Sequence, residues 1–515
     1  MISLFHTHKE QQKCILMSLL IFMTVVGYNI MRGMKETVLR KLSATGAASY
    51  IPFVKIFLVM PVSIILGFFY LYLRHKTGIS RSYYAVSSVF LAYFALFTFH
   101  IIPNIEYYTA DPAWILSMQT TYPFYKYIIG LMGNLPSALY YVFAELWGTF
   151  TLVIMFWSMA NDIFTTDEAS RVYPILSLFS SISIIVSSYI IKSLSICSNP
   201  LEQSTLVILA LGICMLLIVY KLNPSSDQKQ TTTDTPSDNK RIGNKPKKKM
   251  PLYQSFKTAI QTPHILYMAI CVVSFSILIN IVETSLKEKL YFYYDTDQAY
   301  LDYYSFFTYS KGTLSLLANF CNVYLLRKYG WFPIAMITPV LCIITANFFL
   351  YHNAGIVPDF IMQLFQSTDM NFTMMWVACY GMIATYAAKY AFFDTTQQMA
   401  YIPLPEEIRA NGKAAADGIG GRLGKSGSGF ILSGLLAFTA AESSSQGILH
   451  IAPYLIIITT LLSILWIWAM LKLSHSYYTQ LNSQTDGKAS QKTFADISPE
   501  DEPDTGKPQP EVLTT

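Results

Sequence analysis

Glu145 is a carboxylate inside a long apolar stretch of this 515-residue chain, LYYVFAELWGTFTLVIMFW. Inside a membrane-spanning segment, an ionisable residue costs about 2.5 to 3.5 kcal/mol on insertion scales, so it normally faces a polar interior or a water-filled path. Glu145 is therefore predicted to belong to a binding or coupling site. The alternative is a carboxylate that hydrogen-bonds a neighbouring helix for structural reasons.

Two cations follow the first apolar run, in YNIMRGMKETVLRK. If a helix continues past the glycine in this stretch, Arg32, Lys35 and Leu39 lie on one face, because an α-helix turns once every 3.6 residues. Two cations on one inward face make a site for an anion. The alternative is a pair of solvated loop charges.

The seventh apolar run ends with a carboxylate and a lysine, Glu283 and Lys287, in ILINIVETSLKEK. Their four-residue spacing allows a simple pair along one helix, which is the structural alternative to a binding role. Lys55 and Lys311 lie near the starts of the second and eighth runs. A long side chain there can reach the membrane interface, and we interpret both lysines in this way.

Residues 389–430 combine many charges with a glycine-rich end, GGRLGKSGSG. A phosphate-binding loop of the GxxxxGK[ST] type would need glycine where this chain has Ile419, and no strand precedes it, so an ATPase is excluded. Small residues spaced for a close helix contact are Gly420, Gly424, Gly427 and Ser428. This packing would bring Arg422 and Lys425 to a bound anion, and backbone N–H groups there can also reach phosphate oxygens.

The composition is that of a membrane protein. Hydrophobic residues make up 53% and charged residues only 13% of the chain, and the mean hydropathy is +0.38. The net charge of +5 is explained by orientation in a bilayer and does not indicate nucleic-acid binding. No zinc-protease or serine-hydrolase motif occurs, so we predict no catalytic residue, no metal site and no cofactor. The seven cysteines form no CxxC pair and are interpreted as core residues.

Twelve apolar runs divide the chain into two sets of six. They lie at 14–31, 50–73, 82–103, 136–160, 172–192, 205–222, 264–285, 304–326, 331–351, 372–391, 428–441 and 451–473. The intervening PSSDQKQTTTDTPSDNKRIGNKPKKK is too polar to enter a bilayer. We therefore predict an all-α polytopic protein with an N-terminal half (1–222), a basic cytoplasmic linker (223–258), a C-terminal half (259–475) and a disordered cytoplasmic tail (476–515).

Lysine and arginine residues concentrate at the N-terminus, in the linker and in the even-numbered loops. Positively charged loops stay on the cytoplasmic side, which predicts cytoplasmic termini. The main exceptions follow the first helix of each half, at Arg32, Lys35, Arg40, Lys41, Lys287 and Lys289. A matching anomaly in corresponding helices is expected of a two-fold related binding site.

Several stretches resemble the ATP/ADP antiporter family, the non-mitochondrial nucleotide transporters of obligate intracellular bacteria and plastids. They are IMRGMKETVL, IPFVKIFLVMP, AELWGT, FWSMANDIF, DEASRVYPI, NIVETSLKEKL, MITP and KYAFFDTTQQMAYIPLPEEIRANGKAAADGIGGRLGKSG. The last stretch is the most specific, and the resemblance covers nearly the whole chain. The signature of mitochondrial carriers is absent.

The resemblance implies a major-facilitator-like architecture, in which two six-helix halves enclose a cavity that opens alternately to each side. It implies transport of nucleotides, either by exchange of ATP for ADP or by proton-driven import. It also implies functional importance for the charges at Lys35, Glu145, Glu283 and Lys425.

The chain departs from the family pattern at two places. The sequence from Arg32 to Glu36 reads RGMKE where the exchangers usually have R-D/S-x-K-D, and Gln397 stands where they usually have lysine in FDATK. This chain thus has one cation fewer near the cytoplasmic side than the exchangers usually have. Three alternatives to strict exchange of ATP for ADP stay open: transport of another nucleotide, transport of a nucleotide cofactor, and proton symport.

We predict a secondary active transporter of nucleotides in the cytoplasmic membrane. Its partners would be ATP, ADP or another nucleoside triphosphate, membrane lipid and, in the symport alternative, protons. Other possibilities are transport of another phosphorylated anion, of a sugar or of a peptide, and a membrane enzyme or flippase acting on lipid-linked phosphates. The predicted substrate-binding set is Arg32, Lys35, Glu145, Asn161, Glu283, Lys287, Asp394, Arg422 and Lys425.

Overall fold

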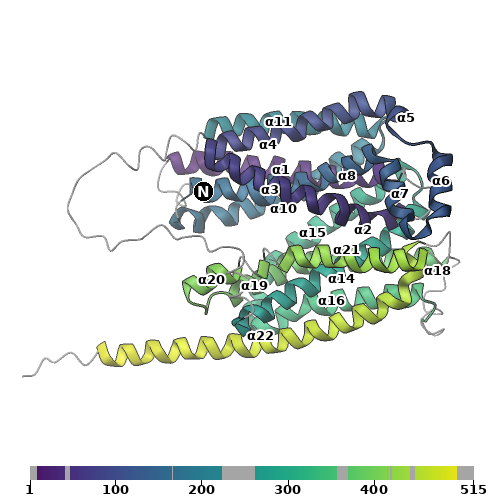
Figure 1. Ribbon diagram of the computed structural model, residues 1–515. Coiled ribbons are helices and arrows are strands. Elements are labelled where there is room, and N and C mark those ends of the chain that lie inside the picture. Colours follow the sequence, from purple (N-terminus) through teal and green to yellow (C-terminus); the bar gives the residue numbers. More distant parts are fainter. Residues whose placement is uncertain are drawn as a thin grey trace, which may run out of the picture.

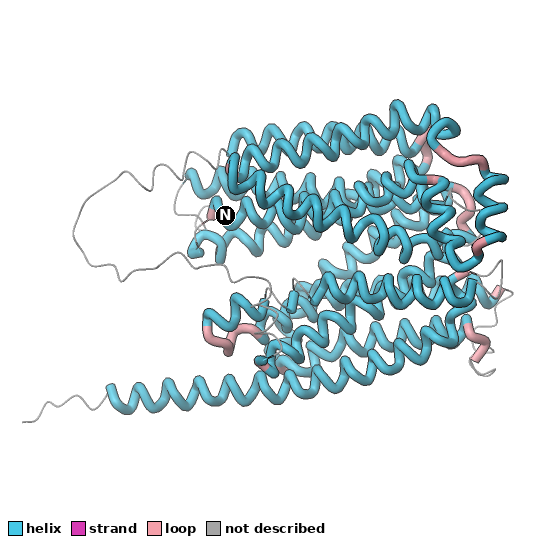
Figure 2. Tube along the Cα trace, viewed as in Figure 1, coloured by secondary structure: helices cyan, strands magenta, loops and turns pink. Residues whose placement is uncertain are grey.

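The computed structural model describes residues 8–40, 47–164, 166–222, 261–356, 369–413, 416–417, 420–440 and 447–495. Within these ranges the regular structure is entirely helical, and the long helices run roughly parallel to one another (Figures 1 and 2). Nine helical segments of the described part are long and apolar enough to cross a membrane. The all-α membrane fold is thus confirmed, and the number of twelve spans stays a prediction.

The N-terminal half begins with one straight helix and continues through helices joined by π-helical or short turns. Its elements are α1 (His8–Arg40), η2 (Ala47–Ser49), α2 (Tyr50–Val54), η3 (Lys55–Val59), α3 (Met60–Thr77), α4 (Ile79–Leu96), η4 (Phe97–Ile101), η5 (Ile102–Asn104), α5 (Ile105–Tyr108), α6 (Pro112–Thr121), η6 (Pro123–Tyr125), α7 (Lys126–Gly133), α8 (Leu135–Trp147), η7 (Gly148–Phe156), α9 (Trp157–Ile163), α10 (Thr166–Ser195) and α11 (Pro200–Leu222).

The C-terminal half also begins with one long helix, which is followed by an unbroken second helix. Its elements are α14 (Pro263–Tyr293), α15 (Asp297–Tyr329), α16 (Trp331–Asn353), α18 (Met370–Ala388), η8 (Lys389–Phe393), α19 (Asp394–Ala400), α20 (Glu406–Lys413), α21 (Gly421–Ala440), η10 (Ile448–Ile451) and α22 (Ala452–Ala495).

Two glycines mark equivalent turns in the two halves. Gly78 ends α3 with a φ of 84°, and Gly330 ends α15 with a φ of 80°. Each lies between the second and third long helix of its half, and this backbone conformation is readily adopted only by glycine. The repeated turn supports the prediction of two related halves.

The described helices extend beyond two of the predicted boundaries. α1 continues without a break past Gly33 to Arg40, which places Arg32 and Lys35 on a helix, as the anion-site prediction required. α22 continues to Ala495, so the disorder predicted for the tail is wrong for residues 476–495. A helix needs no sharp change in composition to continue into water. The predicted linker, 223–258, lies outside the described residues.

The first helix begins and the last helix ends on the same face of the bundle, here called the N-terminal face (Figure 1). α1 ends at Arg40 on the opposite face. There the halves meet through an ion pair between Lys192 and Asp302, 2.8 Å apart, and through a ring contact between Phe124 and Phe438. Ser305 also donates a hydrogen bond to the carbonyl of Ser188, at 2.8 Å.

Candidate binding site between the two halves

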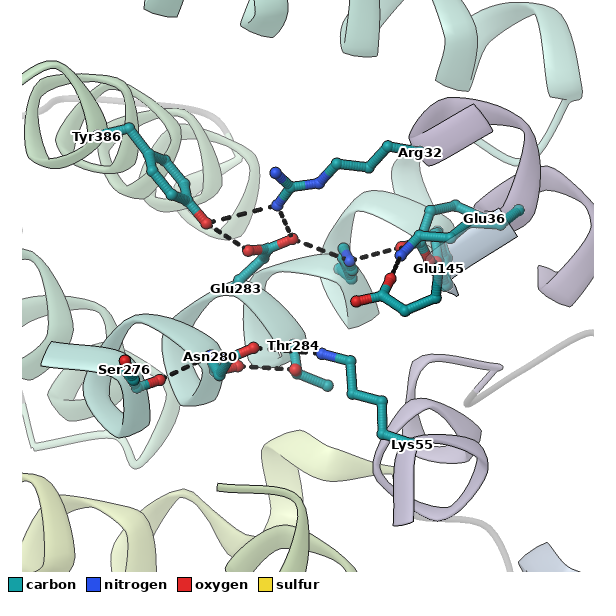
Figure 3. A network of polar contacts seen from close by, with 12 residues as sticks. Arg32, Glu36, Lys55, Glu145, Ser276, Asn280, Glu283, Thr284 and Tyr386 are labelled. Carbon is teal, nitrogen blue, oxygen red and sulfur yellow. Dashed lines mark hydrogen bonds and ion pairs between the residues drawn. The ribbon is translucent and has the colours of Figure 1, made fainter. Parts of the chain in front are cut away.

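α1 and α14, the first helices of the two halves, face one another through charged side chains (Figure 3). Arg32 Nη2 lies 2.8 Å from Glu283 Oε1, and Lys287 Nζ lies 2.7 Å from Glu36 Oε1. The partners are 251 positions apart in both pairs. Because each helix places its charges four residues apart, both rungs form in one register.

A third rung continues the same register. The Arg40 guanidinium lies 5.9 Å from the centre of the Tyr291 ring, and the Tyr291 hydroxyl donates to Glu36 Oε2 at 2.6 Å. Arg40 also donates to the carbonyl oxygen of Tyr294 at 2.6 Å. We call this set the charge ladder; it consists of Arg32, Glu36 and Arg40 on α1 and Glu283, Lys287 and Tyr291 on α14.

Glu283 receives three polar contacts. Besides Arg32, it lies 3.1 Å from Lys287 within α14, and the Tyr386 hydroxyl of α18 donates to it at 2.5 Å (Figure 3). The pair between Glu283 and Lys287 that the sequence allowed is therefore present, as one part of a network that joins the halves. Both carboxylates of the ladder are satisfied by more than one donor, as buried charges require.

Glu145 of α8 pairs with Lys35 of α1 inside the N-terminal half (Figure 3). Lys35 is buried, lies 4.5 Å from the centre of the Tyr141 ring, and is 3.8 Å from Glu36. The pair thus touches the ladder at Glu36. Through Glu36, this pair is connected with the contacts that cross between the halves.

Lys55 and Lys311 do not reach the membrane interface, so that interpretation is wrong for both. Lys55 Nζ lies 3.2 Å from Asn280 Oδ1 of α14, across the boundary between the halves (Figure 3). Lys311 is only 3% exposed and lies against the rings of Phe307 and Tyr386. Both helices turn these lysines inward, an orientation that position near a helix start did not reveal.

π-helical turns accompany three of the charged positions. Lys55 is the first residue of η3, Lys389 is the first residue of η8, and η7 begins three residues after Glu145. An extra residue in a helical turn redirects the side chains that follow, and such turns are frequent at functional sites. These π-helical turns therefore lie next to charged positions of the network, at Lys55, Glu145 and Lys389.

A cavity of about 420 Å³ lies on the N-terminal side of the ladder. It is lined by α1, α10 and Leu152 of η7 from the N-terminal half, and by α15, η8 and α19 from the C-terminal half. The lining residues are Val25, Tyr28, Asn29 and Arg32; Ser177, Ser180, Ser181 and Ile184; Lys311, Ser315 and Asn319; and Tyr390, Asp394, Thr395 and Gln398. Its volume lies within the range of small-molecule sites. Arg32 belongs to both the cavity and the ladder.

Five of the nine predicted site residues come together in the network, namely Arg32, Lys35, Glu145, Glu283 and Lys287. Asp394 lines the cavity and lies 2.8 Å from Lys389. The structure does not bring Asn161 to them: it accepts a hydrogen bond from Tyr173 within the N-terminal half.

Arg422 and Lys425 are exposed on α21, and only Lys425 comes within electrostatic range of the network, through Glu145. The close contact predicted for the glycines is present at Gly424. A side-chain carbon there would collide with Ser276 and would lie 3.0 Å from the carbonyl oxygen of Val273 on α14. A role of these cations in binding an anion stays a prediction.

Gln397, where the family resemblance led us to expect lysine, donates a hydrogen bond to Asp417. Tyr401 donates to the same carboxylate oxygen at 2.8 Å. The amide therefore keeps the hydrogen bond to Asp417 but not the charge that a lysine would add.

Sequence reasoning missed three charged residues of the site, Glu36, Lys55 and Lys311. The signal for Glu36 was the matching four-residue spacing of Arg32 and Glu36 against Glu283 and Lys287, with the order of charge reversed. For Lys311, the signal was the polar face that it forms with Ser315 and Asn319, each four residues further along one helix.

Several known proteins are similar in sequence to this chain over most of its length. The family model described as "TLC ATP/ADP transporter" matches residues 3–477. ADP,ATP carrier protein 1 of Rickettsia bellii is 31% identical over 484 residues, which cover 92% of this chain and 95% of the relative. ADP,ATP carrier protein 4 of Rickettsia conorii is 30% identical over 91% of this chain and 92% of its own.

Solved structures of other transporters share the fold. A bacterial metal transporter superposes with a TM-score of 0.54 at 12% identity, covering 91% of this chain and 99% of its own. A D-xylose–proton symporter gives 0.53 at 13% identity, covering 90% and 96%. These likenesses confirm the major-facilitator-like fold, and the match to the family model over almost all of the helical region shows that this chain belongs to the TLC ATP/ADP transporter family.

Proposed function

We propose that this chain exchanges nucleotides across a membrane, as ATP against ADP, by alternating access of one central site. The observation that carries the proposal is the charge ladder, because it joins the halves through pairs that must part when the halves move relative to one another. The names of the relatives, which are ADP,ATP carriers, support the choice of substrate.

The charges around the ladder favour an anionic substrate. Apart from Arg40, which pairs with Asp297 at 3.5 Å, five cationic side chains meet three carboxylates within this region of the described residues; they are Arg32, Lys35, Lys55, Lys287 and Lys311 against Glu36, Glu145 and Glu283. Excess positive charge away from water is costly unless an anion neutralises it. The phosphates of a nucleotide supply such a charge.

Exchange follows if the ladder holds the empty carrier. Without substrate, Arg32 and Lys287 keep their carboxylate partners across the boundary, which resists separation of the halves on that side. A bound polyphosphate competes for the cations and lowers the cost of parting these pairs. The loaded carrier then changes state more readily than the empty one, as an antiporter requires.

The halves meet at the opposite face, and the cavity lies on the N-terminal side of the ladder. We assign the N-terminal face to the cytoplasm of a cell whose inner membrane holds the protein, in agreement with the distribution of lysine and arginine. Proton-driven import is the second candidate, since Glu145 and Glu283 are carboxylates that can carry a proton.

Purified protein in lipid vesicles tests the proposal. Vesicles loaded with ADP are expected to take up labelled ATP, and empty vesicles are not. A Lys35→Ala, Lys425→Ala double variant is expected to reduce uptake to the background, whereas Lys328→Ala, an exposed lysine, serves as the matched control. Unchanged uptake by the double variant would show that the phosphate roles are wrong.

A proton uncoupler separates the two modes of transport. Exchange of ATP for ADP should be insensitive to the uncoupler and should depend on internal nucleotide. Uptake that proceeds into empty vesicles and collapses with the uncoupler would favour proton symport instead.

A further inference from the structure

Lys311 is a buried lysine without a carboxylate partner among the described residues. It is 3% exposed, and its ammonium group lies 5.7 Å from the centre of the Phe307 ring and 5.9 Å from that of Tyr386. Ring faces offset only part of the cost of removing an ammonium group from water. A buried cation held mainly by aromatic rings is therefore poised to receive an anion.

Lys311 shares the cavity with Arg32, a cation of the charge ladder. Arg32 and Lys311 both line it, from different halves of the molecule. Their common neighbour is Tyr386, which lies beneath both cations and donates its hydroxyl to Glu283. An anion between Arg32 and Lys311 would thus contact both halves and lie beside the carboxylate that now holds Arg32.

The rest of the cavity lining mixes polar and apolar side chains and includes one carboxylate, Asp394. Arg32 and Lys311 lie nearest the ladder, whereas Asp394 and Gln398 lie further along towards the N-terminal face, one and two turns beyond Tyr390. Asp394 pairs with Lys389, 2.8 Å away, and its oxygens can also accept hydrogen bonds from hydroxyl or amino groups. The charges therefore favour an anionic group at the ladder end of the cavity, beside Arg32 and Lys311, and a neutral polar group at the Asp394 end.

Serines form the wall contributed by α10. Ser177, Ser180 and Ser181 follow a three- and four-residue spacing and so lie on one face of the helix. Ser181 donates to the Ser177 carbonyl at 3.1 Å, whereas the hydroxyls of Ser177 and Ser180 have no protein partner within the described residues. These hydroxyls are available to a ligand and add no charge of their own.

We propose that Lys311 is the phosphate ligand of the C-terminal half and forms, with Arg32 of the N-terminal half, a two-cation subsite for the terminal phosphates of a nucleoside di- or triphosphate. This inference rests on the proposed function and deepens it. The nucleoside then points towards Asp394 and the serine face of α10. Because the subsite spans both halves, bound phosphate links their positions directly.

The test compares Lys311→Met with Lys328→Met, an exposed lysine of the same helix, in the purified full-length chain. Binding of ATP, ADP, AMP and inorganic tripolyphosphate is measured by titration calorimetry. Lys311→Met should weaken ATP and ADP binding by about tenfold or more, given the strength of hydrogen bonds to charged groups, and AMP binding much less. Tripolyphosphate should compete with ATP in the wild-type chain and in Lys328→Met, but only weakly in Lys311→Met.

Thermal unfolding separates this role from a structural one. Since methionine removes a buried charge, the empty Lys311→Met variant should unfold at the same or a higher temperature than the wild type. Lys311→Arg keeps the charge and should retain the stronger binding of ATP over AMP. If Lys311→Met fails to fold, Lys311→Gln takes its place in the comparison, because it also removes the positive charge. ATP affinity within about twofold of the wild type, or an equal loss for ATP and AMP, would overturn the subsite.

The outcomes also distinguish the subsite from the proposed function. If the wild-type chain exchanges ATP for ADP in vesicles and Lys311→Met does so equally well, the subsite alone is wrong. If tripolyphosphate binds through Lys311 but wild-type vesicles exchange no nucleotide, the proposed function alone is wrong.

Discussion

The first helices of the two halves carry the same kinds of charge in opposite order. α1 presents Arg32 and then Glu36, whereas α14 presents Glu283 and then Lys287. If α1 and α14 carried the same charges in the same order, like charges would lie opposite each other across the boundary. The side chains of the two helices are therefore complementary across the boundary, while the turns at Gly78 and Gly330 support the prediction that the halves have related backbones.

Reversing one charge should break this complementarity with the largest effect. Glu283→Arg would place a third cation beside Arg32 and Lys287. Removing one partner of a buried pair costs about 3 to 5 kcal/mol. We expect nucleotide exchange to fall to background and the unfolding temperature to drop clearly, as measured by vesicle uptake and by thermal unfolding in detergent.

The swapped double variant Arg32→Glu, Glu283→Arg is the control for that reversal. It restores opposite charges across the boundary and should recover much of the lost stability. If the double variant is no more stable than Glu283→Arg, the two side chains do not stabilise the protein as a pair.

The second rung should show a smaller and measurable coupling. In a double-mutant cycle of Glu36→Gln and Lys287→Met, contacting charges typically couple by about 0.5 to 3 kcal/mol. Equilibrium unfolding of the four proteins gives this energy. Additive effects of the two substitutions would place the rung outside the stabilising contacts, despite the 2.7 Å separation of the groups.

The third rung lies nearest the opposite face, and its loss should loosen that face. Arg40→Ala removes hydrogen bonds to carbonyl groups of the C-terminal half, each worth about 1.5 to 3 kcal/mol for a charged donor. In a cysteine-free background, a Ser49→Cys reporter should then be labelled faster by a membrane-impermeant maleimide, because Ser49 is buried. Lys126→Ala is the control, and equal labelling in both backgrounds would contradict the sealing role.

Loss of a contact outside the charge ladder, the cap of α18 by Asp369, should have the smallest effect on the unfolding temperature. Asp369 accepts the backbone N–H of Phe372 at 3.0 Å and caps α18, and this hydrogen bond lowers the pKa of its carboxyl group. A lowered pKa in the folded state means stabilisation above the pKa of the unfolded chain, lost as pH falls through the folded value. Asp369→Ala should therefore lower the unfolding temperature slightly at neutral pH, and the difference should vanish in acid. Asp111→Ala, at the cap of α6, is the matched comparison, and a pH-independent difference at Asp369 would contradict this account.

The fold followed from apolar runs of spanning length, because hydrocarbon leaves a helix as the simplest way to satisfy the backbone. The anion-binding character of Arg32 and Lys35 followed from helical periodicity once α1 was taken past Gly33. The carboxylates that pair with these cations could not be predicted from helical periodicity. Which carboxylate faces which cation depends on the packing of helices more than 100 residues apart in sequence, as for Lys35 and Glu145, and periodicity within one helix carries no such information.

The inward orientation of Lys55 and Lys311 was missed for a related reason. A lysine near a helix start is compatible with both an interface and an interior, and the choice is made by neighbouring helices.

The length of α22 has a mechanical consequence. Its 44 residues span about 66 Å at 1.5 Å per residue, roughly twice the 30 Å of a bilayer core. The helix therefore projects well beyond the N-terminal face, and its inner part is packed in the C-terminal half (Figure 1). A small tilt of the C-terminal half therefore moves the C-terminal end of α22 over a much larger distance. A fluorophore near residue 490, paired with one at the start of α1, would convert each turnover into a change of distance large enough to follow in single molecules.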